Sequence, residues 1–381
     1  MLTNANLIDQ RLTNQHLTGP GLEKAGDVVA WLGAVQAQDY TGAKWAVGQR
    51  MQAADDGVLE QAFAQGEILR THVMRPTWHF VAPADIRWLL ALTAPRVNAV
   101  NAYMYRKLEL DEALFGRSNE VIAAALQGGR QLTRSEIGDV LARAGIKAAG
   151  MRLGYILHRA ELDAVICSGG RHGKQFTYAL LHERAPQAKT LSHDEALAEL
   201  TKRYFTSHGP AQVQDFAWWS GLTKTEAAAG LAMLEGQLIS ETIDDQTYWL
   251  VPAASVVKPA GPTAWLLPNY DEYLISYRNS GPVLNPAHVQ LIEKSNPLFA
   301  HFIVIDGCMI GTWRREFKKD TVIITLNPFE PFSDVQCAAV YHQALRYGQF
   351  LGMTAEVRLT ADRKLPGQPL SHPGSDQLSG L

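Results

Sequence analysis

The stretch that decides the fold begins with Leu132-Thr133-Arg134-Ser135-Glu136 and ends with Gln175-Phe176-Thr177-Tyr178-Ala179-Leu180. Thr133 is a candidate helix N-cap, and Glu136 follows at the spacing of a capping box. This helix is expected to end at Gly145, and a second helix over 151–162 follows a short turn. A short helix over 121–126 precedes the pair. Two β-type runs, 164–167 and 175–180, then pair across a glycine-rich basic tip. The order predicts a winged helix-turn-helix unit.

The same order of elements occurs on both sides of this unit. Upstream, helices are expected over 6–12, 23–35 and 56–65, and strands over 68–73 and 77–81 with a turn at Met74-Arg75-Pro76. A helical stretch over 83–114 follows. Downstream, helices over 192–207, 213–219 and 223–236 precede strands over 238–243 and 247–251, with capping boxes at Ser192 and Thr223. The recurrence of element order predicts three tandem winged helix-turn-helix motifs.

The pattern changes after a proline-rich linker over 252–262. Short strands are expected over 265–267, 273–275, 302–305, 308–313, 321–326 and 355–359, with one helix over 333–350. These elements predict a C-terminal β-barrel-like domain, partly open. The fold class is therefore α+β. We expect the first winged-helix unit with its following helix over 1–115, the second over 116–185, the third over 186–258, the barrel-like domain over 259–364 and a tail over 365–381.

Composition limits the functional classes. Hydrophobic residues make up 46% and charged residues 19% of the 381 residues, as in a well-packed soluble protein. Three distant cysteines fit a reducing cytoplasm, and the N-terminus shows no signal-like pattern. We expect a cytoplasmic protein that is not bound to a membrane and is a monomer. The net charge of −3 does not indicate a nucleic-acid binder. Residues 130–176, however, hold eight lysines and arginines against four acidic residues, so any basic surface is local.

A second informative stretch is Ala34-Val35-Gln36-Ala37-Gln38-Asp39-Tyr40. Residues two apart share a face in an extended chain but not in a helix. If Gln36 and Gln38 act together, the preceding helix must end near Val35 and the chain must run extended, with Asp39 turned to the other face. The alternative is a polar loop that closes the helix.

Gln36-Ala37-Gln38-Asp39 resembles the glutamine–apolar–glutamine motif of the AlkZ-like DNA glycosylases. The resemblance continues in Met74-Arg75-Pro76-Thr77-Trp78-His79-Phe80-Val81 and Leu266-Leu267-Pro268-Asn269-Tyr270-Asp271-Glu272-Tyr273, and it covers nearly the whole chain. The family combines three tandem winged-helix motifs with a β-barrel. A related branch has aspartate at the second polar position, so Gln38 places this chain in the Gln-Gln branch.

The resemblance implies an enzyme that removes alkylated purines, including bulky N7 adducts and interstrand crosslinks, from double-stranded DNA. N7 alkylation makes the purine a good leaving group, so the enzyme needs to position water more than it needs a strong acid. A side-chain amide can hold water by donating and accepting hydrogen bonds. Gln36 and Gln38 are therefore the expected catalytic pair. No cofactor, no metal and no lysine nucleophile are expected.

Two further groups of residues are candidates within this function. Supporting positions around the motif are expected at Asp39, Trp45, Asn269 and Asp271. DNA contacts are expected from cationic and imidazole side chains on the hairpins and one later strand: Arg70, His72, Arg75, His79, Arg171, His172, Lys174 and Arg314. His72 and His79 could equally be polar groups packed inside their hairpin.

Other functional classes are less well supported. The chain has no GxGxxG after a strand, no P-loop, no HExxH and no GxSxG, so nucleotide, zinc and serine-nucleophile chemistry are not expected. A winged-helix transcriptional regulator without catalysis is the main alternative, and it predicts operator binding without base release. A scaffold whose winged helices bind protein is a third possibility.

Overall fold

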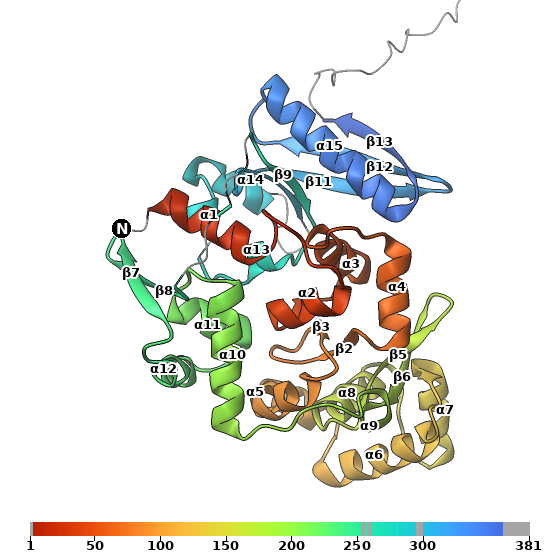
Figure 1. Cartoon of the computed structure of the whole chain (residues 1–381). Coiled ribbons are helices and arrows are strands. Elements are labelled where there is room, and N and C mark those ends of the chain that lie inside the picture. Colours follow the sequence, from red (N-terminus) through yellow and green to blue (C-terminus); the bar gives the residue numbers. More distant parts are fainter. Residues whose placement is uncertain are drawn as a thin grey trace, which may run out of the picture.

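The computed structural model describes residues 3–252, 256–257, 259, 261–279, 281–294 and 300–360. The expected tail over 365–381 and part of the expected linker over 252–262 lie outside these ranges. In Figure 1 the C-terminal sheet lies at one end of the molecule and helices α6–α8 at the other. None of the described helices is both long and apolar enough to cross a membrane.

The N-terminal segment combines helices with a small antiparallel sheet in the order β1-β3-β2. Its elements are α1 (Asn4–Asn14), α2 (Ala25–Leu32), β1 (Val35–Gln36), α3 (Tyr40–Gln49), α4 (Asp56–Gln65), β2 (Leu69–His72), β3 (Trp78–Val81) and the long α5 (Ile86–Lys107). The predicted elements are present. Helix α3 was not predicted, because nearly all its residues are buried and it therefore lacks an amphipathic pattern.

The second segment contains α6 (Glu112–Leu126), β4 (Leu132–Thr133), α7 (Arg134–Arg143), α8 (Gly150–Leu162), β5 (Ile166–His172), β6 (Gln175–Leu180) and α9 (Leu181–Arg184). The capping box of Thr133 and Glu136 is confirmed at the start of α7. Helix α6 is longer than predicted, because the side chain of Asp111 accepts a hydrogen bond from Leu114 N–H and starts the helix earlier.

The third segment follows the prediction closely. It contains α10 (His193–Ser207), α11 (Val213–Ser220), α12 (Lys224–Ala232), β7 (Ile239–Ile243) and β8 (Gln246–Leu250). The predicted capping boxes at Ser192 and Thr223 are both formed. All three segments thus place helices before an antiparallel hairpin.

The C-terminal segment forms a five-stranded sheet in the order β13-β12-β11-β10-β9. It contains β9 (Ala264–Leu267), α13 (Glu272–Ile275), the 3-10 helices η1 (Gly281–Val283) and η2 (Pro286–His288), α14 (Val289–Lys294), β10 (His301–Ile305), β11 (Cys308–Lys318), β12 (Thr321–Pro328), α15 (Asp334–Leu351) and β13 (Thr354–Leu359). β12 and β13 are parallel, and the other neighbours are antiparallel. Within the described residues β9 and β13 do not pair, so the expected barrel is not confirmed.

The strand predicted over 273–275 is wrong, because these residues form helix α13. The side chain of Asp271 accepts a hydrogen bond from Tyr273 N–H at 2.9 Å and caps this helix. The apolar Tyr-Leu-Ile run is typical of a strand, but the capping aspartate directly before it favours a helical turn.

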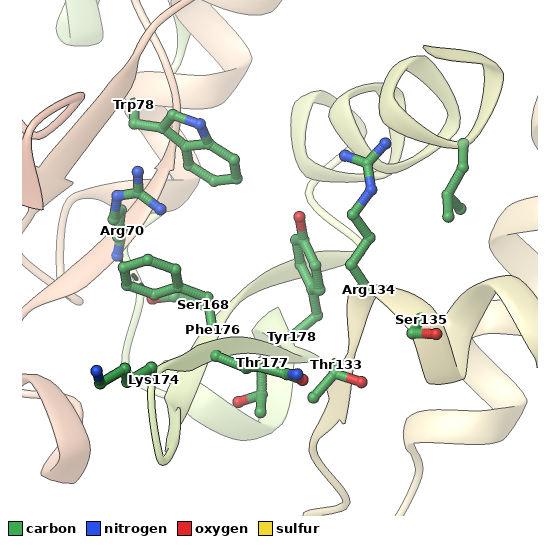
Figure 2. A pocket seen from close by; sticks show the side chains of 12 residues that line it. Arg70, Trp78, Thr133, Arg134, Ser135, Ser168, Lys174, Phe176, Thr177 and Tyr178 are labelled. Carbon is green, nitrogen blue, oxygen red and sulfur yellow. Dashed lines mark hydrogen bonds between the residues drawn. The ribbon is translucent and has the colours of Figure 1, made fainter. Parts of the chain in front are cut away.

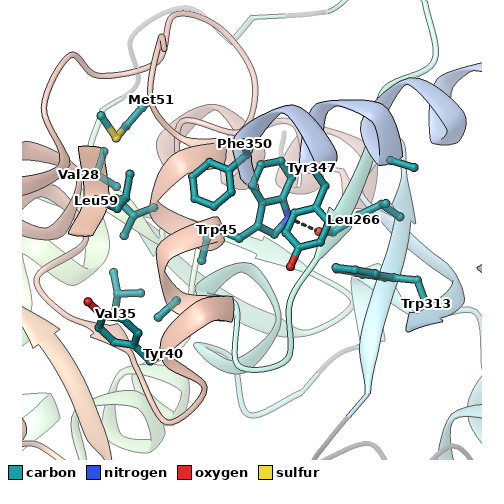
Figure 3. Close-up of a cluster of buried hydrophobic side chains, with 14 of the residues drawn as sticks. Val28, Val35, Tyr40, Trp45, Met51, Leu59, Leu266, Trp313, Tyr347 and Phe350 are labelled. Atoms are coloured by element: carbon teal, nitrogen blue, oxygen red, sulfur yellow. Dashed lines mark hydrogen bonds between the residues drawn. The ribbon is translucent and has the colours of Figure 1, made fainter. Parts of the chain in front are cut away.

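One hydrophobic core joins the N-terminal segment to the C-terminal sheet. Trp45 on α3 packs against Tyr347 and Phe350 on α15, with ring centroids 5.0 and 5.1 Å apart. Its indole N–H donates to the carbonyl of Leu266 at 2.8 Å, as Figure 3 shows. Trp45 therefore fixes α3, which directly follows the Gln36–Gln38 segment, against the C-terminal sheet.

A buried ion pair makes a second connection between the same two segments. The guanidinium of Arg50, at the end of α3, donates to both carboxylate oxygens of Asp271 at 2.7 and 2.9 Å, and both side chains are almost completely buried. Arg50 also donates to the side-chain carbonyl of Gln15 at 3.0 Å. Asp271 thus supports the site through Arg50 and α13.

Removing the Asp271 carboxylate is expected to destabilise the protein strongly. Asp271→Ala leaves the Arg50 charge buried without its partner, which costs about 3–5 kcal/mol of the free energy of unfolding. Urea denaturation at neutral pH measures this loss. The control is Glu235→Ala at an exposed position, expected to change the free energy of unfolding by less than about 0.5 kcal/mol. Equal stability of the two variants would contradict a supporting role for the ion pair.

Candidate active site

The Gln36–Gln38 segment starts as an extended strand beside the first hairpin and bends at Gln38. Helix α2 ends at Leu32, where Gly33 adopts a φ of 80° that favours glycine. Gln36 in β1 then pairs with His79 in β3. One residue later, the N–H of Ala37 donates to the carbonyl of Trp78 at 2.7 Å. The helix thus ends before Gln36, and the chain is extended at Val35 and Gln36 before it bends at Gln38.

The side-chain carbonyls of Gln36 and Gln38 both contact the β2–β3 hairpin. The Gln36 carbonyl accepts from the guanidinium of Arg75 at 3.0 Å, and the Gln38 carbonyl accepts from the backbone N–H of Trp78 at 3.3 Å. Gln36 is buried, whereas Gln38 is exposed. Neither amide nitrogen donates a hydrogen bond within the described part of the chain. The carbonyls thus orient the amides, and the amino groups can donate to a bound molecule.

Asp39 faces the C-terminal sheet and ends the extended segment. One carboxylate oxygen accepts from Gly42 N–H at 3.0 Å and caps α3, and the other accepts from Arg315 at 2.5 Å. Arg315 lies on the same face of β11 as the buried Trp313, because alternate residues of a strand share a face. The adjacent Arg314 is exposed. Asp39 therefore positions α3 and holds Arg315 near the motif.

Glu272 fixes the backbone of the motif from the other side. Its carboxylate accepts from the N–H of Gln36 at 2.9 Å, from the indole N–H of Trp219 at 2.8 Å and from the hydroxyl of Ser276 at 2.7 Å. His208 Nε2 lies 3.6 Å away. Burial alone would raise the pKa of Glu272, but the contact with His208 and the hydrogen bonds from Ser276 and Gln36 lower it to about 2. A buried carboxylate thus stays ionised beside the motif.

A cavity of about 660 Å³ adjoins the motif. Arg70 lines it and donates through Nε to the carbonyl of Ala37 at 3.1 Å. The guanidinium lies between the rings of Trp78 and Phe176, 4.1 and 4.5 Å from their centroids. Burial lowers the pKa of Arg70 to about 10, so it stays charged at neutral pH. Arg70 therefore lines this cavity and is not an exposed side chain available to a phosphate.

His79 is buried in the packing of the hairpin, and His72 is largely buried, with 14% of its side chain exposed. Nδ1 of His72 lies 2.5 Å from the buried Glu161, and its ring stacks on Trp78 and His158. His79 is fully buried. Burial lowers the pKa of each of these two histidines to about 3, and burial raises that of Glu161. The packing of both imidazoles favours the alternative that they are polar groups inside their hairpin, and the DNA contacts expected from them stay a prediction.

The other expected DNA contacts differ in exposure. Arg171 is partly buried and pairs with Glu60 at 3.4 Å. His172 and Lys174 are exposed at the β5–β6 hairpin tip, and Arg314 is exposed on β11. Arg75 is half-buried and is used to hold Gln36. The three exposed side chains remain accessible to phosphate.

The supporting roles of Trp45, Asn269 and Asp271 stay predictions, and two further side chains hold the motif. Asn269 donates its backbone N–H to His301 at 2.8 Å, beside the strand that carries Arg315. Glu272 and Arg315 were not predicted to contact the motif. The alternation of β11 after Trp313 could have identified Arg315 as the inward cation. No sequence signal indicates that Glu272 accepts the Gln36 N–H, because that contact spans 236 residues.

Comparison with known proteins identifies the chain. The sequence model of the AlkZ-like DNA glycosylases matches residues 29–350. The chain belongs to this family. It is a DNA glycosylase, and an interpretation as a regulator without catalysis is not supported. An interstrand DNA cross-link repair glycosylase from Streptomyces sahachiroi is 25% identical over 359 residues, covering 90% of this chain and 95% of that protein.

The fold of this AlkZ-like glycosylase is also shared with a solved structure. Streptomyces sahachiroi DNA glycosylase AlkZ matches it with a TM-score of 0.79 and 22% identity, covering 94% of this chain and 100% of the other. The match covers most of the mixed α+β chain.

The low pKa of Glu272 predicts how stability depends on pH. The folded pKa of about 2 lies below the unfolded value of about 4.3, so the carboxylate stabilises the fold above the unfolded pKa. This contribution is lost as the pH falls from about 5 toward 2. Glu272→Gln should therefore be less stable than the wild type at pH 7 and closer to it at pH 3.

Urea denaturation at both pH values measures this change. Glu235→Gln, an exposed matched control, should follow the wild type at each pH. A Glu272→Gln stability deficit that is the same at pH 7 and pH 3 would show that Glu272 is not ionised in the folded protein.

Proposed function

We propose that this AlkZ-like glycosylase hydrolyses the N-glycosidic bond of N7-alkylated purines in double-stranded DNA, with Gln36 and Gln38 holding the attacking water. The observation that carries the proposal is the pair of oriented amides: both carbonyls are held by the first hairpin, and both amino groups are left without a partner among the described residues. The motif is rigid because backbone hydrogen bonds hold Gln36 and Ala37.

The chemistry suits this arrangement. An N7-alkylated purine carries positive charge and leaves readily, so the main tasks are to place water and to stabilise a cationic sugar. One amide can donate its amino group to the water oxygen while the other accepts from the water through the second lone pair of its carbonyl oxygen, which leaves a water lone pair free to attack; the proton of the water is released to solvent. The ionised carboxylate of Glu272 adds negative charge near the sugar without having to accept a proton. No lysine nucleophile is used, so the enzyme is monofunctional.

The fold supplies DNA contacts in this proposal. We interpret the three segments that place helices before a hairpin as winged-helix motifs, with the basic tip of β5–β6 beside the DNA. His172, Lys174 and Arg314 are exposed cations or imidazoles that can contact phosphates. Because the relative from Streptomyces sahachiroi is named for interstrand cross-link repair, unhooking of such crosslinks is included in the proposal. That the enzyme is monomeric and cytoplasmic stays a prediction.

Substitution of the two glutamines tests the assignment. Gln36→Ala and Gln38→Ala should each lower the single-turnover rate of N7-methylguanine release from duplex DNA by about 100-fold, because the water loses its positioning. Affinity for the duplex should change little, since neither amide is a phosphate contact.

The matched control is Gln237→Ala, an exposed glutamine in the third segment, which should release the base at the wild-type rate. Unchanged release by both motif variants would refute the water-holding role. Binding of the wild type to a specific operator sequence without base release would instead favour a regulator.

A further inference from the structure

The cavity beside the motif contains groups that the proposed hydrolysis does not use. Figure 2 shows the stacked Trp78, Arg70 and Phe176 on one side, Ser135 with the start of α7 on the other, and Tyr178 between them. Its volume of about 660 Å³ lies in the range of sites for drug-sized molecules.

The cavity is attached directly to the motif. The backbone N–H of Trp78 donates to the side chain of Gln38 at 3.3 Å, and the side chain of Arg70 donates to the carbonyl of Ala37 at 3.1 Å. A nucleotide whose sugar faces Gln36 and Gln38 therefore has this cavity next to its base.

The walls are suited to a planar aromatic group. Phe176 and Tyr178 line the cavity with aromatic rings, and the planar guanidinium of Arg70 packs against Trp78 and Phe176 in the same wall. Contact with such planar groups is largely indifferent to the hydrogen-bonding pattern of the ring that is bound. The cationic Lys174 is exposed at the edge, where DNA phosphates would lie. An aromatic interior with a cationic rim suits an aromatic group joined to DNA.

We propose that this cavity binds a planar aromatic substituent carried on N7 of the damaged purine and so determines which bulky adducts the enzyme favours. The inference rests on the proposed function, because the motif marks where the damaged nucleotide lies. N7 and the glycosidic nitrogen belong to the same five-membered ring, so a group on N7 begins close to the bond that is broken. N7 also lies on the major-groove edge, where a substituent leaves the base stack.

The size of the cavity favours a substituent over an extruded base. A drug-sized volume is much larger than a single nucleobase needs. The two possible occupants, a substituent and an extruded base, also lead to different binding preferences. A substituent site discriminates between adducts, whereas a base site would bind purines with small and large N7 groups alike.

A binding experiment tests the proposal without requiring catalysis. Two duplexes carry N7-methylguanine or N7-benzylguanine on a 2′-fluoroarabinose sugar, which resists hydrolysis, and dissociation constants are measured at one fixed salt concentration. The wild type should bind the benzyl duplex about 10-fold more tightly than the methyl duplex, as expected from one added stacking contact.

Two variants should remove this preference. Ser135→Trp fills the cavity from an exposed position on α7, and Phe176→Leu removes a stacking ring while keeping an apolar side chain. The matched control is Ala142→Trp, an exposed position on α7 that does not line the cavity; it should keep the 10-fold preference. Thermal unfolding of each variant verifies that it is folded.

The outcomes separate this inference from the proposed function, which is tested in parallel by base release from ordinary duplexes. A wild type that prefers the benzyl duplex but releases neither base would refute the proposed function and leave the cavity assignment intact. Base release with no benzyl preference, or a preference that survives Ser135→Trp, would overturn the assignment. Equal loss of affinity for both duplexes in Ser135→Trp would also overturn it, because the cavity would then hold the base or the backbone.

Discussion

The arrangement of the site depends on one buried carboxylate. Glu272 comes from the C-terminal segment, yet it accepts hydrogen bonds from Gln36 in the N-terminal segment and from Trp219 in the third segment. Such a charge is costly to bury unless several donors satisfy it. Because these donors come from distant parts of the chain, the carboxylate is satisfied only when the segments are assembled. The position of the catalytic motif is thus tied to the complete fold.

The C-terminal sheet also holds the catalytic motif in place, through contacts with helix α3. Trp45 fixes α3 against α15, and the pair of Asp39 and Arg315 joins the start of α3 to β11. The hairpin β2–β3 holds the two glutamine carbonyls from the opposite side. A weakly basic group such as an amide contributes to catalysis only through accurate placement, so this rigid support has a direct chemical purpose.

Much of the fold could be predicted from local sequence signals. The capping boxes at Thr133, Ser192 and Thr223 located three helix starts, because a cap is a contact between residues three apart. The extended conformation at Gln36 was expected only if the two glutamines act together, because residues two apart share a face in an extended chain. Prediction from local sequence failed where contacts with distant segments determine which residues are buried. Helix α3 has no polar face, and an aspartate cap turned the apolar run after Asp271 into a helix instead of a strand.

The candidate site could be predicted only in part for the same reason. The motif can be recognised from adjacent residues, but the exposure of each cationic side chain depends on segments far away in the sequence. His72 and His79 occupy hairpin positions typical of DNA contacts, and only the packing of α8 and its Glu161 shows that His72 is paired and buried. Burial also changes the role of Arg70 from a surface cation to part of an aromatic stack.

The most direct test is a crystal structure of the protein bound to duplex DNA with a cationic pyrrolidine in place of the damaged nucleotide's sugar. The account predicts one ordered water within about 3.2 Å of the side-chain amides of both Gln36 and Gln38, on the side of the sugar opposite the departing base. It also predicts the pyrrolidine nitrogen beside the exposed side chain of Gln38, with the buried Glu272 on the opposite side of the motif backbone. A sugar analogue bound away from the β2–β3 hairpin, with both glutamines contacting only protein, would contradict it.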